Sequence, residues 1–87
     1  MLSGTLIIRT VTHYYVGEVV ASPPPPDGFL ALRKCSWVAD TGRWHVALRD
    51  GTLSEVEPYP ASAIVLVNLG AVVDITRWDH ELPTKAK

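Results

Sequence analysis

The chain has 87 residues, of which 47% are hydrophobic and 20% are charged, and its formal net charge is −1. This composition is typical of one small folded domain and excludes a disordered chain. The small net charge provides no overall positive field that would draw the chain to nucleic acid or acidic membranes. Apolar runs such as residues 63–67 are too short to cross a bilayer. Residues 1–8 lack the pattern of a signal peptide, so we expect a protein of a reducing cytoplasm.

A domain this small buries a limited share of its surface and usually needs a further source of stability. Cys35 is the only cysteine, so an internal disulfide is excluded. His13, His45 and His80 fall in three separate segments without the spacing of metal ligands. We therefore predict no metal and no cofactor, and we expect the protein to form a homo-oligomer.

The first part of the chain predicts three strands. Residues 5–12 and 13–21 are rich in β-branched and aromatic residues, and Gly17 in the middle of the second strand predicts a bulge or bend. Residues 22–28, SPPPPDG, must form a loop, because proline lacks the N–H group that a sheet requires. Residues 29–34 form the third predicted strand, which runs on towards Trp37.

A short helix is predicted next. Thr41 or Asp40 can cap a helix that begins near Gly42. Trp44 and the residues three and four positions later give this helix an apolar stripe, and Gly51 can end it. About two turns of helix are stable only when they pack onto the sheet.

The last part of the chain predicts two more strands. Residues 52–63 contain two prolines, so we expect most of this segment to be irregular. Residues 64–68 are apolar enough for a central strand, and residues 71–78 form the fifth strand, with Val73 and Ile75 facing inward.

Five short strands with one inserted helix predict a mainly β fold. The architecture is a small SH3-like or Sm-like barrel, or a bent five-stranded antiparallel sheet with one short inserted helix. Residues 65–75, VLVNLGAVVDI, resemble the closing strand–glycine–strand element of Sm-like proteins. Residues 1–79 form a single domain in this prediction, and residues 80–87 form a flexible C-terminal tail.

A second resemblance covers residues 5–75. The elements that carry it are, in order, Ile7–Thr10, Val16-Gly17, Asp27-Gly28 before Phe29–Leu32, Ser36-Trp37 and a short helix ending at Gly51. This order is similar to that of a family of small uncharacterised proteins from tailed phages and prophages. Members of that family open with a V-R-T strand and carry an I-W-x-W-type segment before the helix. Here the second tryptophan falls later, at Trp44, the loop has four prolines, and the linker 53–60 has no counterpart. The resemblance implies a phage context and no established activity.

Aromatic and basic residues are concentrated in residues 37–49, beside the start of the predicted helix. A helix N-terminus attracts anions, an arginine can bind a phosphate, and a tryptophan can stack on a base. We therefore predict a nucleotide-like ligand. The residues assigned to bind it are Trp37, Arg43, Trp44, His45, Arg77 and Trp78. In the alternative interpretation, Trp44 anchors the helix to the core and Arg43 is solvated.

Arg9 shares one face of the first strand with apolar residues. Such an arginine either extends to solvent or pairs with a carboxylate such as Glu18 or Asp74. At a subunit boundary it would serve an interface, to which we assign Arg9, Tyr14 and Tyr15.

Two features point weakly to catalysis. Cys35 follows Arg33 and Lys34, and nearby positive charge lowers the pKa of a thiol. The alternative is a small, half-buried residue. Asp79-His80 resembles an acid–base pair, but no nucleophile motif accompanies it, and a solvated tail is the alternative. We predict that the protein is not an enzyme.

Three functional hypotheses follow. The first, which we favour, is a non-enzymatic phage-type binding module. It would be a homo-oligomer in the cytoplasm of an infected bacterial host that sequesters a nucleotide-derived ligand or host immune signal. The second is a virion structural protein, such as a decoration or connector protein, in which the proline loop and the tail make contacts. The third is an Sm-like nucleic-acid-binding protein. The proline loop is either a ligand for an SH3 or WW partner or a stiff turn.

Overall fold

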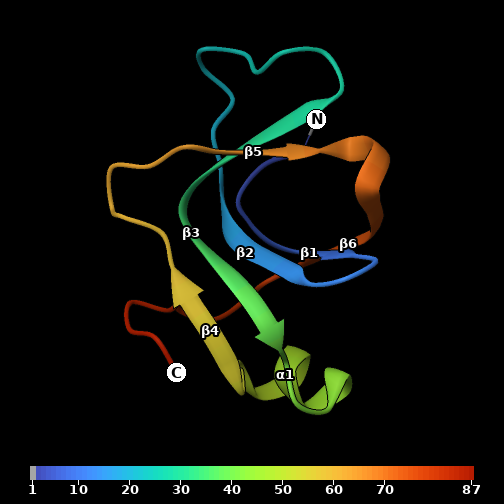
Figure 1. The fold of residues 1–87 in the computed structure, drawn as a ribbon, viewed down its shortest axis with the longest axis vertical. Coiled ribbons are helices and arrows are strands. Elements are labelled where there is room, and N and C mark those ends of the chain that lie inside the picture. The colour runs from blue at the N-terminus through green and yellow to red at the C-terminus, as the bar shows by residue number, and fades with distance from the viewer. Residues whose placement is uncertain (1) are drawn as a thin grey trace.

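Residues 2–87 are described by the computed structural model, and they form a mainly β fold with one short α-helix (Figure 1). The elements are β1 (Thr5–Thr10), β2 (Tyr14–Val19), β3 (Phe29–Asp40), α1 (Trp44–Asp50), β4 (Glu55–Pro58), β5 (Val65–Asn68), the 3₁₀ helix η1 (Leu69–Ala71) and β6 (Val72–Arg77). Every strand pairing is antiparallel. The predicted fold class is confirmed.

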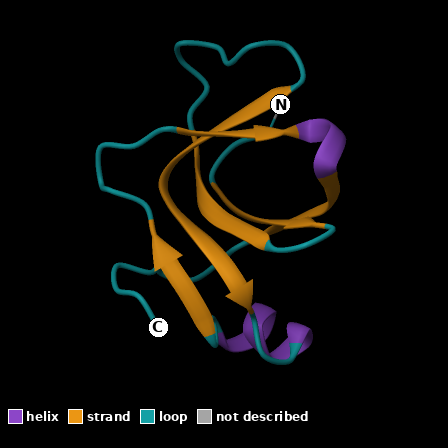
Figure 2. Ribbon diagram, viewed as in Figure 1, coloured by secondary structure: helices purple, strands orange, loops and turns teal. Residues whose placement is uncertain are grey.

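The strands follow the order β4-β3-β2-β1-β6, and β5 pairs with the first half of β3. The long strand β3 therefore has β2 along one edge, and β5 and then β4 along the other. In Figure 2 the strands curl around a common interior, and the 3₁₀ helix joins β5 to β6. The spatial strand order β6-β1-β2-β3-β5 is that of a small SH3-like barrel. Strand β4 and helix α1 are added to it.

The curl of the sheet depends on a bulge where β2 and β3 meet. Lys34 has a φ of 49°, in the left-handed region, and the β2–β3 register shifts between Val16 and Glu18. Gly17 lies opposite: a Cβ atom added there would come within 3.2 Å of the Arg33 carbonyl oxygen and the Cys35 Cα atom. Glycine makes this close approach possible without displacing β3, whereas a larger residue would push the β3 backbone away by a few tenths of an ångström. The irregularity predicted at Gly17 is present in the β2–β3 pairing, but the extra residue belongs to β3 and Gly17 lies opposite it.

The curled sheet has an apolar core on each face. The core inside the barrel consists of Leu6, Ile8, Leu30, Leu32, Cys35 and Val67. The core on the outer face consists of Ile7, Val16, Val38, Ala47, Leu53, Val56 and Trp78. Adjacent residues of a strand point to opposite faces, so β1 contributes Ile7 to one core and Ile8 to the other. Helix α1, strand β4 and the C-terminal segment thus cover the outer face.

Helix α1 packs as its apolar stripe predicts, but it starts later than expected. Ala47 is buried in the outer core, and Trp44 and Leu48 pack against it. The N-cap residue is Arg43, which makes no side-chain cap. The expected cap at Thr41 or Asp40 is wrong, because the Asp40 carboxylate instead accepts a hydrogen bond from the Gly42 N–H group (2.8 Å), ahead of the helix.

Strand β4 was not expected from the sequence. Its residue Val56 pairs with Val38 of β3 and is buried in the outer core. Pro58 is compatible with the strand because it is the last residue of β4. Strand β5 was expected to be central, but it pairs with β3 alone and forms an edge of the sheet.

The face of β6 that packs inward also differs from the prediction. The side chain of Val73 is 55% exposed, whereas Val72 and Ile75 pack against the inner core. The reason is a register shift in the β1–β6 pairing between Arg9 and Thr10, which changes the alternation at the start of β6.

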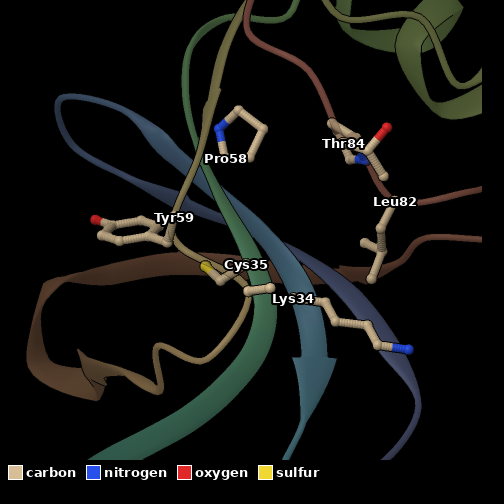
Figure 3. A pocket seen from close by; sticks show the side chains of 8 residues that line it. Lys34, Cys35, Pro58, Tyr59, Leu82 and Thr84 are labelled. Atoms are coloured by element: carbon tan, nitrogen blue, oxygen red, sulfur yellow. The ribbon is translucent and has the colours of Figure 1, made fainter.

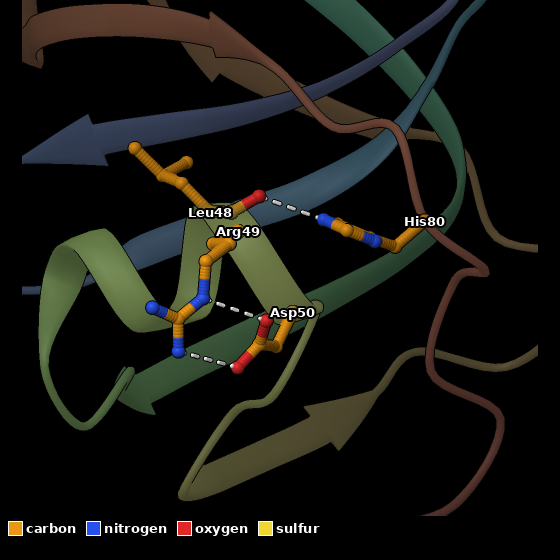
Figure 4. A network of polar contacts seen from close by, with 4 residues as sticks. All are labelled: Leu48, Arg49, Asp50 and His80. Atoms are coloured by element: carbon orange, nitrogen blue, oxygen red, sulfur yellow. Dashed lines mark hydrogen bonds and ion pairs between the residues drawn. The ribbon is translucent and has the colours of Figure 1, made fainter.

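The C-terminal segment packs against the domain, in place of the loose tail that we expected. Leu82 contacts the outer core, and the Lys87 N–H group donates to the Val56 carbonyl (2.9 Å). The His80 Nε2–H group donates to the Leu48 carbonyl (2.7 Å) at the end of α1 (Figure 4). This bond satisfies a carbonyl group that a helix terminus leaves without an intrahelical partner.

Gly51 ends α1 in the left-handed conformation, with a φ of 75°. A Cβ atom added there would lie 2.6 Å from Cγ of His80. Gly51→Ala should therefore lower the free energy of unfolding by about 2–3 kcal/mol, through backbone strain and a steric conflict. The matched control is Gly28→Ala, with a φ of 83° and no heavy atom within 4 Å of the added group. Strain alone should cost about 1 kcal/mol there.

Urea denaturation of the two variants measures the difference. The His80→Ala variant lacks the imidazole ring that the new Cβ atom would meet. Gly51→Ala should therefore destabilise the His80→Ala protein less than it destabilises the wild-type protein, and closer to the cost of Gly28→Ala. Equal losses for the two glycine variants would contradict the packing of the C-terminal segment onto α1.

Candidate functional site

Three aromatic rings form a surface cluster, which we call the aromatic patch and define as His13, Tyr15 and Trp37. Tyr15 on β2 and Trp37 on β3 are direct cross-strand partners, so their side chains share one face of the sheet. The His13 ring lies 4.8 Å from the Tyr15 ring and 5.5 Å from the Trp37 ring, centroid to centroid. Trp37 remains 36% exposed. The patch therefore offers an aromatic surface to solvent.

Two hollows flank the aromatic patch. The first has a volume of about 310 Å³ and the second about 260 Å³. The first is lined by Thr10, Val11, Thr12, His13, Tyr15, Phe29, Leu66, Val67, Asn68 and Ala71. The second is lined by Trp37, Glu57, Pro58, Tyr59 and Pro60. The patch contributes rings to both hollows, so the three features form one continuous, mainly apolar surface.

Polar groups at this surface are few and mostly occupied. The His13 Nδ1 atom and the Thr12 hydroxyl are 2.8 Å apart, whereas His13 Nε2 is buried and has no hydrogen-bond partner within residues 2–87. Burial, followed by the neighbouring Tyr15 and Cys35, raises the pKa of Tyr59 above its ordinary value. Tyr59 therefore stays a neutral phenol at physiological pH.

A second aromatic group lies on the opposite face of the sheet. The Tyr14 and Trp44 rings stack, with centroids 5.4 Å apart, and the Arg9 guanidinium carbon lies 5.8 Å from the Trp44 centroid. Arg9 forms an ion pair with Asp74, and this hydrogen bond raises the pKa of Arg9. Of the two arrangements predicted for Arg9, pairing with a carboxylate is the one found.

The residues predicted to form an interface are divided by this geometry. Tyr14 and Tyr15 are adjacent in β2, so they point to opposite faces. Tyr14 packs against the outer core with Arg9 nearby, and Tyr15 packs against the inner core.

The residues predicted to bind a ligand are also dispersed. Trp78 is only 3% exposed and its indole N–H donates to the Glu81 carbonyl (3.2 Å), so a ligand cannot stack on it. Trp44 is half-buried on the outer face, and Arg43 and His45 are exposed beside it at the start of α1. Arg77 is exposed at the end of β6. The residues predicted to bind a ligand therefore do not lie together, and only Trp37 lies on the aromatic patch.

Cys35 is not activated. Burial raises the pKa of its thiol to about 12, which agrees with the alternative of a small buried residue and not with a thiol activated by neighbouring positive charge. In Figure 3 the Lys34 side chain extends away from the Cys35 sulfur. Both residues line a hollow of about 250 Å³, together with Pro58, Tyr59, Leu82 and Thr84. Desolvation of the sulfur thus outweighs the charge of Lys34.

The remaining sequence candidates for chemistry are used structurally. His80 binds the end of α1, and Figure 4 also shows the Arg49–Asp50 pair, whose hydrogen bonds lower the pKa of Asp50. Within residues 2–87, no three His, Cys, Asp or Glu side chains gather where they could hold a metal ion. The same residues contain no helix with the length and apolar character needed to cross a membrane.

Comparisons of the chain with protein families, characterised proteins and solved structures gave no match. The site is therefore argued from geometry. Sequence reasoning missed His13, Glu57 and Tyr59 as neighbours of Trp37. The high aromatic content of residues 13–15 could have indicated an aromatic cluster. The β2–β3 register that brings these residues to Trp37, however, depends on the bulge at Lys34.

The raised pKa of Cys35 predicts slow reaction with thiol reagents. At pH 8 the thiolate fraction for a pKa of about 12 is about a thousandfold smaller than for the ordinary value of 9.0. Labelling with 5,5′-dithiobis(2-nitrobenzoate) should therefore be slower by at least that factor in the native protein than in the urea-unfolded chain. Rapid native labelling would contradict the burial of this thiol.

Proposed function

We propose that this protein is a non-enzymatic binding module that holds a flat aromatic ligand, such as the base of a nucleotide, on the aromatic patch. The observation that supports the proposal is the exposed Trp37 ring beside the rings of His13 and Tyr15. Stacking of a base on an aromatic side chain contributes about 1–3 kcal/mol and needs no charged group. The hollows on both sides of the patch give room for the rest of the ligand.

The polar groups at the rim favour a ligand that donates hydrogen bonds. Glu57 lines the second hollow and offers a carboxylate to an amino group of a base. The buried His13 Nε2 atom has no hydrogen-bond partner among residues 2–87, and a polar group that reached it would complete its hydrogen bonding. These groups suit a purine or a similar heterocycle better than an aliphatic ligand.

The electrostatics of the site favour the base over the phosphate. None of the residues that line the two hollows is a lysine or an arginine. Arg43, to which we had assigned the phosphate, is exposed at the start of α1 and lines neither hollow. A nucleotide on the patch therefore leaves its phosphates in solvent.

The charge distribution argues against the Sm-like nucleic-acid alternative. Three of the five arginines are paired with carboxylates, in Arg9–Asp74, Arg33–Glu18 and Arg49–Asp50. These pairs interrupt any basic stripe that could follow a phosphate backbone.

The resemblance to small phage proteins adds a setting in which capture of a nucleotide-derived host signal would serve the phage. This part of the proposal rests on that resemblance alone.

The proposal predicts how Trp37→Ala changes binding of adenosine, guanosine and their 5′-monophosphates, measured by isothermal titration calorimetry. Loss of stacking should weaken the best-bound nucleoside at least about tenfold. The matched control is Val73→Ala, which alters an exposed side chain on β6 away from the patch and should leave the affinity unchanged.

No lysine or arginine lines the hollows. The dissociation constants of each nucleoside and of its monophosphate should therefore differ by no more than a few-fold. Unchanged affinity in Trp37→Ala would contradict the site. Phosphate-dependent binding that Arg43→Ala abolishes would instead support the site predicted from the sequence.

A further inference from the structure

The outer edge of β5 has no partner strand within residues 2–87, because β5 pairs with β3 alone. The Leu69 N–H group donates to the Gly28 carbonyl (2.9 Å), just beyond the end of that pairing. Hydrogen-bonded positions alternate along an antiparallel ladder, so Val65 and Val67 direct their backbone groups to β3. The backbone N–H and C=O groups of Ile64, Leu66 and Asn68 point outward, away from β3. The edge therefore presents free donors and acceptors.

This edge is also apolar and uncharged. The side chains of Ile64 and Leu66 are 53% and 49% exposed, and Phe29 and Leu69 are exposed nearby. Residues 61–71 contain no charged residue and no proline, which are the features that normally protect an exposed edge. The outer edge of β4 is different, because Val56 and Lys87 exchange two backbone hydrogen bonds there. An apolar, unprotected edge indicates a surface that is covered in the functional state.

We infer that β5 pairs antiparallel with β5 of a second copy of this chain, across a two-fold axis at Leu66. In this register Leu66 faces Leu66 of the partner subunit, and Ile64 faces Asn68 of the partner subunit. The outward-facing backbone groups of these residues then form the continuous ladder of a two-fold interface. This inference is independent of the proposed ligand.

Charge favours a second copy as the occupant. A neutral edge meets its own copy without like-charge repulsion, so it is complementary to itself. The free edge of β6 is a poorer partner, because β6 contains the charged residues Asp74 and Arg77. A hollow of about 430 Å³ lies beside β5, lined partly by Pro23 to Pro26, Ile64 and Leu66, and adds apolar area next to the short ladder. A four-residue ladder needs such area to approach the roughly 800 Å² per partner of a stable interface.

The two-fold pairing has a consequence for the ligand site. Leu66 and Asn68 also line the first hollow beside the aromatic patch. The partner strand therefore lies at the rim of this hollow and narrows its opening to solvent.

Sedimentation velocity of the full chain over micromolar concentrations tests the inference. The wild-type protein should sediment as a dimer, and Leu66→Lys should be a monomer because it brings two positive charges together on the axis. Val73→Lys, with its exposed side chain on β6, is the matched control and should stay dimeric. Circular dichroism checks that each variant is folded.

Cysteine cross-linking tests the register directly. Hydrogen-bonded antiparallel residues have Cα atoms about 5.5 Å apart, within the range of a disulfide. Leu66→Cys should form a covalent dimer on mild oxidation, whereas Val73→Cys should not, and the buried Cys35 should not interfere. A monomeric wild-type protein, or a larger assembly without this cross-link, would overturn the inference. Nucleoside binding is measured on Ile64→Lys, which places a lysine in the same interface but lines neither hollow beside the aromatic patch. A monomeric Ile64→Lys that still binds nucleosides would show that the dimer and the proposed ligand site are independent.

Discussion

Strand β3 changes direction at Lys34, which is the one non-glycine residue within residues 2–87 with a positive φ. On the neighbouring strand β2, Gly17 has no side chain and so leaves room for the bulge in β3. A lysine in this conformation costs about 1 kcal/mol, which packing on both sides of the bulge offsets. Leu32 and Cys35 are three residues apart, yet both reach the inner core, because Lys34 is an extra residue in the strand. The bulge lets one strand pair first with β5 and then with β4.

The same bulge determines where the side chains of the candidate binding site lie. A one-residue shift exchanges the faces of all later residues of a strand, so Trp37 joins Tyr15 and not Tyr14. Val38 then faces outward and anchors α1, β4 and Trp78 in the outer core. The aromatic patch, the outer layer and the free edge of β5 thus follow from one local feature of β3. The three tryptophans have different environments: Trp37 is exposed on the aromatic patch, whereas Trp44 is half-buried and Trp78 is buried in the outer layer.

Local patterns were sufficient to predict the mainly β fold, the irregularity at Gly17 and the end of α1 at Gly51, because each depends on residues close in the chain. Strand β4 was missed because its pairing with β3 spans the helix, and its two nearby prolines indicate a loop. The residues predicted to bind a ligand do not form one cluster, for a related reason. Residues 37–49 are close in sequence, but the alternation of β3 and the burial of Trp78 separate their side chains.

The most direct test of this account is a two-dimensional NMR spectrum of the three indole N–H groups during titration with adenosine or guanosine. The account predicts that the Trp37 signal shifts while the Trp78 signal, whose N–H is bonded to Glu81, stays in place. The Trp44 signal, from the opposite face of the sheet, should also be unchanged. A ligand-dependent shift of Trp44 with no change at Trp37 would contradict the assignment of the binding surface to the face that the bulge in β3 creates.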